Sequence, residues 1–119
     1  MASEAPAIRA LGEIASCNQE VDMRTMLRWT VPVERGNEAI KDGSIEQTIE
    51  TLLQLLAPEA AYFLAEHGER AGMMFFDMAD PSQIPQIAEP LFQNLDAAVE
   101  FVPVMNADDL RNALAKVTS

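Results

Sequence analysis

Residues 60–78, AAYFLAEHGERAGMMFFDM, decide the fold because two strand-like runs surround one tight turn. Ala60–Glu66 and Arg70–Met78 are both rich in aromatic and apolar residues. The dipeptide His67-Gly68 joins them, and a short link that contains a glycine is typical of antiparallel strands. The stretch therefore predicts a β-hairpin.

A strand and a helix are expected before this hairpin. Arg24–Val33 alternates apolar and polar residues, as a strand with two different faces does. A helix is expected to begin at Ser44, whose spacing to Gln47 is that of a capping box. Its apolar stripe ends before Pro58, which favours termination there. Only a short helical turn, Glu38–Lys41, is expected between the strand and this helix.

A helix and a strand are also expected after the hairpin. Asp80-Pro81, followed by Gln83, has the composition of a helix start. Val99–Met105 then predicts a fourth strand, in which Pro103 is typical of a sheet edge. Asn106 is expected to cap a final amphipathic helix.

This order of elements predicts a split βαβ sandwich of the α+β class. Two right-handed crossovers joined by a hairpin favour one antiparallel sheet in the strand order 4-1-3-2, with both crossover helices on the same face. The residues expected beneath the helices are Leu27, Trp29, Val31, Phe63, Met74, Phe76, Val99 and Phe101.

The opposite face of the sheet is also rich in apolar residues. If Glu66 pairs with Glu69, Tyr62 lies opposite Met73 and Leu64 opposite Ala71. The residues expected on this open face are Tyr62, Leu64, Met73, Phe75, Val102 and Val104, with Met26, Arg28, Thr30, Asp77 and Glu100. Because exposed apolar patches of this size usually mark interfaces, we expect a symmetric homodimer through this face. The alternative is that the last helix or residues 1–22 cover it.

Length and composition limit the other classes of protein. The 119 residues suit one domain, residues 23–119, preceded by an extension, residues 1–22, that is either loosely ordered or an arm crossing to a partner. A net charge of −11, from 19 acidic and 8 basic residues, argues against binding to nucleic acid or to an anionic membrane. No basic, apolar leader is present, so a cytoplasmic location is expected. A single Cys17 and a single His67 predict no metal site.

Several segments resemble a family of small uncharacterised bacterial proteins. They are MLRWTVPVERGNEAIKDGS, PEAAYF, FDMADPSQIPQIAEPLF and VEFVPVMNADDL, between Met23 and Val117. That family is assigned to the dimeric α+β barrel superfamily, which has a ferredoxin-like fold. The resemblance implies this fold and a dimer, but it brings no catalytic residues and no cofactor. The wider superfamily includes muconolactone isomerases, cofactor-independent monooxygenases and haem-binding proteins, so the fold alone does not define a reaction.

Four residues of the open face are candidate ligand-binding residues: Arg28, Tyr62, Phe75 and Glu100. Arg28 and Glu100 either form a structural ion pair or anchor a small acidic or enol-bearing ligand. Tyr62 either donates a hydrogen bond to a ligand or fills the barrel. Phe75 belongs with Met73, Met74, Phe76 and Met78 either to an adaptable cavity or to an ordinary core.

The remaining polar candidates favour structural interpretations. His67 is expected to be a solvated turn residue, Asp77 to assist the turn after its strand, and Glu66 and Glu69 to be solvated charges. Cys17 has no basic neighbour that would lower its pKa, so a catalytic thiol is not expected. No catalytic residue is identified.

Two functional hypotheses follow. The first is a homodimeric module that binds or transforms a small apolar or enolic molecule without a metal or cofactor. The alternative is a non-catalytic dimerisation or regulatory domain. A cavity of a few hundred Å³ that touches Arg28 or Tyr62 would favour the first hypothesis.

Overall fold

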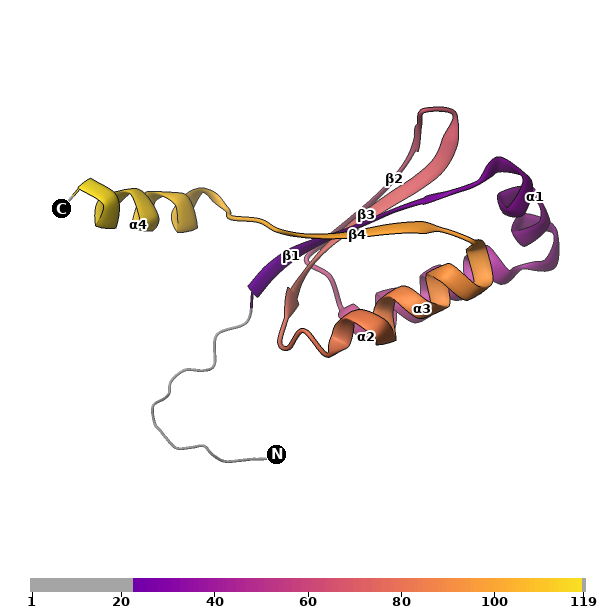
Figure 1. Ribbon diagram of the computed structural model, residues 1–119, viewed down its shortest axis with the longest axis horizontal. Helices are drawn as coiled ribbons and strands as arrows, with labels where there is room; N and C mark the ends of the chain where they lie inside the picture. The colour runs from indigo at the N-terminus through magenta and orange to yellow at the C-terminus, as the bar shows by residue number, and fades with distance from the viewer. Residues whose placement is uncertain (1–22, 119) are drawn as a thin grey trace.

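The computed structural model describes residues 23–118. Its elements, in chain order, are β1 (Met23–Val31), α1 (Val33–Asp42), α2 (Ser44–Leu56), β2 (Ala60–Glu66), β3 (Glu69–Met78), α3 (Gln83–Leu95), β4 (Ala98–Pro103) and α4 (Ala107–Thr118). The class is α+β, and the four strands form one antiparallel sheet (Figure 1). The strand order is β2-β3-β1-β4, which reads 4-1-3-2 from the β4 edge. The expected extension or arm, residues 1–22, lies outside the described residues.

The hairpin has the predicted register. Glu66 pairs with Glu69, Tyr62 with Met73 and Leu64 with Ala71. His67 and Gly68 have φ values of 53° and 79°, so both turn residues are in the left-handed region. This is the conformation of a type I′ turn, which follows the natural twist of the two strands.

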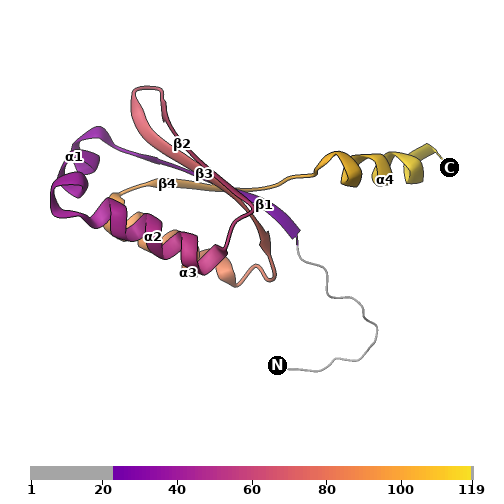
Figure 2. The ribbon, with the colours of Figure 1, turned by 180° about the vertical axis from the view of Figure 1, so that it is seen from behind.

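The two crossover helices lie on one face of the sheet (Figures 1 and 2). The fully buried side chains between them and the sheet include Leu27 and Met74 from the central strands, Leu52 from α2 and Leu91 from α3. Val99 and Phe101 of β4 are partly buried against this core. The predicted assignment of apolar residues to the helix-covered face is therefore confirmed for the central strands and β4.

Helix α1 is longer than expected. It spans ten residues from Val33, so the predicted turn Glu38–Lys41 is only part of it. The strand ends at Val31 rather than Val33 because Pro32 precedes the first helical turn, and its carbonyl accepts a hydrogen bond from the Gly36 N–H at 2.8 Å. Ala39 of this helix is completely buried, and this burial stabilises the helix despite Gly36 within it.

The predicted capping box at Ser44 is wrong. Gly43, with φ of 80°, lies between α1 and α2 and occupies the cap position of α2, and no side chain caps this end. Instead, the Ser44 N–H donates to Asp42 Oδ1 at 2.9 Å, and Ser44 Oγ accepts from Arg35 Nη2 at 3.3 Å. Hydrogen bonds from the Ser44 side chain and backbone lower the pKa of Asp42.

The connection from β3 to α3 uses the residues that the sequence singles out, but α3 begins later, at Gln83. Asp80 Oδ1 accepts from the Ser82 N–H at 2.8 Å, and Gln83 Oε1 accepts from the Ala79 and Asp80 N–H groups at 2.8 and 3.3 Å. These bonds satisfy the backbone N–H groups of three residues that directly precede the helix.

Helix α4 extends away from the sheet in both ribbon views (Figures 1 and 2). Asn106 and Asp109 cap its start reciprocally: Asn106 Oδ1 accepts from the Asp109 N–H at 2.7 Å, and Asp109 Oδ2 accepts from the Asn106 N–H at 3.1 Å. Arg24 of β1 also donates to Asp109. None of the residues of α4 that the structure describes is buried. In this chain α4 therefore leaves the open sheet face uncovered.

Candidate functional site

The open face carries all four candidate residues. Arg28 of β1 pairs with Glu100 of β4 on one side and with Met73 of β3 on the other, and Met73 in turn pairs with Tyr62 of β2. Met26, Arg28, Met73 and Phe75 are half-buried, whereas Tyr62 and Glu100 are exposed. The register therefore brings these side chains to one surface, as the alternation predicts.

Arg28 is held by two carboxylates of the same chain. Its Nε lies 3.8 Å from Glu100 Oε1, and its Nη2 forms a closer ion pair with Glu66. The expectation that Glu66 is a solvated charge is wrong, because its side chain is only 24% exposed and its Oε1 is buried without a hydrogen-bond partner among residues 23–118. The arrangement neutralises the guanidinium within the sheet surface.

Tyr62 and Phe75 form an aromatic pair beside these charges. Their ring centroids are 6.5 Å apart, with an angle of 72° between the planes. Phe75 is half-buried, but the Tyr62 side chain is 59% exposed. Both rings present apolar surface on the open face, next to the Arg28 ion pairs.

The other sequence candidates are dispersed. His67 is an exposed turn residue, and Asp77 is exposed opposite Arg24. The methionine and phenylalanine residues of β3 do not form one cluster, because Met74, Phe76 and Met78 belong to the core while Met73 and Phe75 lie on the open face. Cys17 lies outside the described residues.

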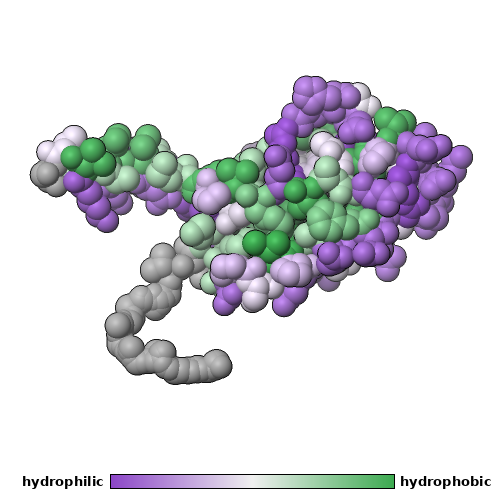
Figure 3. All heavy atoms as spheres, in the orientation of Figure 1, coloured by the Kyte–Doolittle hydropathy of each residue, from purple (hydrophilic) through white to green (hydrophobic). Residues whose placement is uncertain are grey.

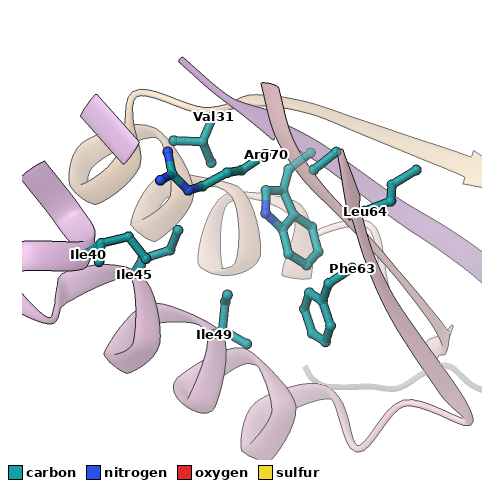
Figure 4. A pocket seen from close by; sticks show the side chains of 9 residues that line it. Val31, Ile40, Ile45, Ile49, Phe63, Leu64 and Arg70 are labelled. Carbon is teal, nitrogen blue, oxygen red and sulfur yellow. The ribbon is translucent and has the colours of Figure 1, made fainter. Parts of the chain in front are cut away.

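A cavity of about 270 Å³ lies on the helix-covered side, which sequence reasoning missed. It opens between helices α1 and α2 and the β2–β3 edge (Figure 4). Its lining is almost entirely apolar and comprises Trp29, Val31, Ile40, Ile45, Ile49, Phe63, Leu64, Arg70 and Ala71. Neither Arg28 nor Tyr62 touches it.

Aromatic side chains form the strand side of this cavity. Trp29 of β1 and Phe63 of β2 make an edge-on pair with centroids 6.2 Å apart. Trp29 is 2% exposed, but Phe63 is 54% exposed because it extends from the edge strand beyond the cover of the helices. The sequence predicts that Phe63 lies on the covered side, yet it does not reveal that α2 leaves space beside it.

Arg70 is the one charged residue of the cavity. Its Nη2 donates to Asn37 Oδ1 of α1 at 3.1 Å. The guanidinium lies so close to Gly36 that a Cβ there would be 2.6 Å from Nη1, so a larger residue would displace it. Among residues 23–118, the other four arginines, Arg24, Arg28, Arg35 and Arg111, all form ion pairs with carboxylates, whereas Arg70 does not.

Two further observations concern residues 23–118 alone. In this part of the chain, no three His, Cys, Asp or Glu side chains are placed so that they could hold a metal ion. Within the same residues, the helices are too short or too polar to cross a bilayer.

Comparison with known proteins gives no relative. The chain matches no family model, no curated protein and no solved structure.

Proposed function

We propose that this protein is a cytoplasmic homodimeric association module whose two sheets meet through their open faces. The observation that carries the proposal is the uncovered face itself: α2 and α3 cover one side of the sheet, and no described element covers the other. Met26, Met73, Phe75 and Val102 share that side, and contiguous apolar surface of this kind favours association. Two such sheets packed face to face would form a dimeric α+β barrel.

The charges on the open face support association more than ligand binding. Arg28 already has two carboxylate partners, so it is not left needing an acidic ligand. A neutralised ion-pair network beside apolar residues is compatible with burial against another protein surface, where it would fix the register of the partner. In this proposal Arg28, Tyr62, Phe75 and Glu100 are interface residues.

Helix α4 supports the same conclusion. Hydrophobic side chains gather along one side of it and hydrophilic ones along the other (Figure 3). The apolar residues Leu110, Leu114 and Val117 are 44%, 51% and 77% exposed. A second copy seated on the open face would give this amphipathic helix a surface to contact.

Sedimentation velocity of wild-type protein and two glutamate variants tests the proposal. Wild type should sediment as a dimer, Met73→Glu should sediment as a monomer with an unchanged circular dichroism spectrum, and Phe92→Glu should remain a dimer. Phe92 is the matched control because it is a 41% exposed apolar residue of α3, on the other side of the sheet. A monomeric wild type at high concentration, or a dimeric Met73→Glu, would reject the proposed interface.

A variant in α4 tests the contribution of that helix separately. Leu114→Glu should weaken dimerisation at least tenfold without changing the unfolding of the monomer, since α4 has no buried residue among those described. If the dimer dissociation constant does not change, α4 lies outside the interface.

Binding of a small molecule is the second candidate function. The specific observation in its favour is the apolar cavity beneath α1 and α2. This cavity does not involve the four residues expected from the sequence, so a ligand role for Arg28 or Tyr62 has no support from it.

A further inference from the structure

The cavity on the helix-covered side carries an inference beyond the proposed dimer. We propose that it binds a small carboxylic acid with an apolar tail or ring, whose carboxylate pairs with Arg70 and whose apolar part lies against Ile45, Ile49 and Phe63. The site lies on the opposite side of the sheet from the proposed interface, so each proposal can be tested independently of the other.

The charge of Arg70 specifies the acidic end of the ligand. A guanidinium has five N–H donors, and Arg70 uses one of them on a neutral amide, Asn37. The chain has 19 acidic residues and only 8 basic ones, yet no carboxylate among residues 23–118 pairs with Arg70. The remaining N–H groups can therefore donate to a ligand carboxylate, and two parallel hydrogen bonds are the strong geometry for this pair.

The lining specifies the other end of the ligand. Ile45 and Ile49 of α2 are half-buried, and Phe63 across from them is more than half exposed. Figure 4 shows these side chains on the two sides of the cavity, with Arg70 at one end near Val31. An apolar ligand body placed there would remove surface from water on both walls.

The volume limits the ligand to a small molecule. At about 270 Å³ the cavity is slightly below the range of roughly 300–1,000 Å³ that is common for sites of drug-sized ligands. A medium-chain fatty acid or an aromatic acid has the required combination of one carboxylate and a compact apolar part.

Trp29 provides a direct probe because it is the only tryptophan of the chain and lines the cavity. We would titrate the full chain with octanoate and with 1-octanol, which has the same chain length without a carboxylate, and follow Trp29 emission. Octanoate should give a saturable change, and Arg70→Gln should weaken it at least tenfold. The response to 1-octanol should be weaker than that to octanoate in wild type and should not change in Arg70→Gln.

Two further variants control this experiment. Arg111→Gln removes an exposed arginine of α4 and should bind octanoate as wild type does. Ile49→Phe reduces the cavity and should abolish the response to both compounds, which keeps the proposal testable if Arg70→Gln does not fold. The monomeric Met73→Glu variant should still bind octanoate.

Four outcomes would overturn the inference: octanoate binding that is unchanged in Arg70→Gln, octanoate binding that is unchanged in Ile49→Phe, equal affinity for octanoate and 1-octanol, or no saturable response. Binding that appears only after removal of residues 1–22 would also overturn it, because the chain's own N-terminal segment would then be the occupant. Failure here with an intact dimer rejects the ligand site alone.

Discussion

The two faces of the sheet come from the same alternating strands but differ in what they bury. On the helix-covered face, Leu27 and Met74 are 0% exposed, and the only buried polar side chain that β1 contributes is Thr25. On the open face, their neighbours Met26 and Met73 are half-buried and share the surface with Arg28 and its two carboxylate partners. The face that α2 and α3 cover is mostly apolar, whereas the uncovered face combines apolar area with paired charges, as protein interfaces commonly do.

The largest difference between the faces should appear in neighbouring truncations of β1. Leu27→Ala should lower the free energy of unfolding by about 3 kcal/mol, because it removes a fully buried side chain from a packed core. Met26→Ala should lower that of the monomer by about 1 kcal/mol, since Met26 is only half-buried in one chain. Urea denaturation measures both losses, at protein concentrations below the dimer dissociation constant. Equal losses would show that the open face is covered within a single chain.

Gly72→Ala tests how tightly the covered face is packed. A Cβ at Gly72 would lie 2.7 Å from Cη2 and 2.8 Å from Cε2 of Trp29, so the indole must move. Because Trp29 is nearly fully buried, we expect a loss of about 2 kcal/mol in the free energy of unfolding. The emission spectrum of Trp29 should shift together with this loss. An unchanged spectrum and unchanged stability would mean that the ring has room above the sheet.

A smaller effect is expected from the charges of the open face. Arg28→Met leaves the half-buried carboxylate of Glu66 without its partner and should cost about 1–2 kcal/mol, the lower end of the range for a bond to a charged group because both side chains are about a quarter exposed. Glu66→Gln in the Arg28→Met background should recover most of the loss. Chemical denaturation of Arg28→Met, of Glu66→Gln and of the double variant completes a double-mutant cycle, which gives the interaction energy of the two residues. Additive effects would show that the two residues do not interact.

The smallest effect concerns the attachment of the covering helix α3. A hydrogen bond from the Ser82 backbone, and to a lesser extent one from its side chain, hold the pKa of Asp80 below its ordinary value of 3.8. A carboxylate with a depressed pKa in the folded state contributes stability above 3.8 and loses it as the pH falls through the folded pKa. Asp80→Asn keeps the Oδ1 acceptor, so its thermal stability should fall less than that of wild type between about pH 5 and pH 2. The same acid dependence in both proteins would contradict this role of Asp80.

The sequence was sufficient to predict which side chains lie on each face of the sheet, because two local rules determine this. The period of two in each strand and the two-residue turn at His67-Gly68 define which side chains share a side. Pro58 likewise marks the end of α2 with a local steric cause, and the helix ends at Leu56.

Other features depend on tertiary structure that no local pattern encodes. Gly36 and Asn37 are poor helix formers, yet both lie in α1, where the burial of Ala39 and the contact with Arg70 outweigh their weak propensity. The sequence predicts Glu100, directly across from Arg28 on the neighbouring strand, as its partner, but the closer carboxylate is that of Glu66 on β2.

The cavity was missed for a similar reason. The cavity depends on the space between α2 and Phe63. The hydrophobic periodicity of a helix or of an edge strand does not determine the distance between the two. That Arg70 pairs with the amide of Asn37 and with no carboxylate among residues 23–118 also emerges only once the positions of the carboxylates are known.

The length of the turn at His67-Gly68 determines which side chains of β2 lie on each face of the sheet. Its two left-handed residues set the phase in which β2 meets β3, and thereby decide that Phe63 belongs to the cavity and Tyr62 to the other surface. If one inserted residue shifted this phase, the roles of the two rings would be exchanged while the composition stayed nearly constant. A second inserted residue would restore the original assignment. In this hairpin, loops of even and odd length would therefore place opposite sets of β2 side chains on the covered face.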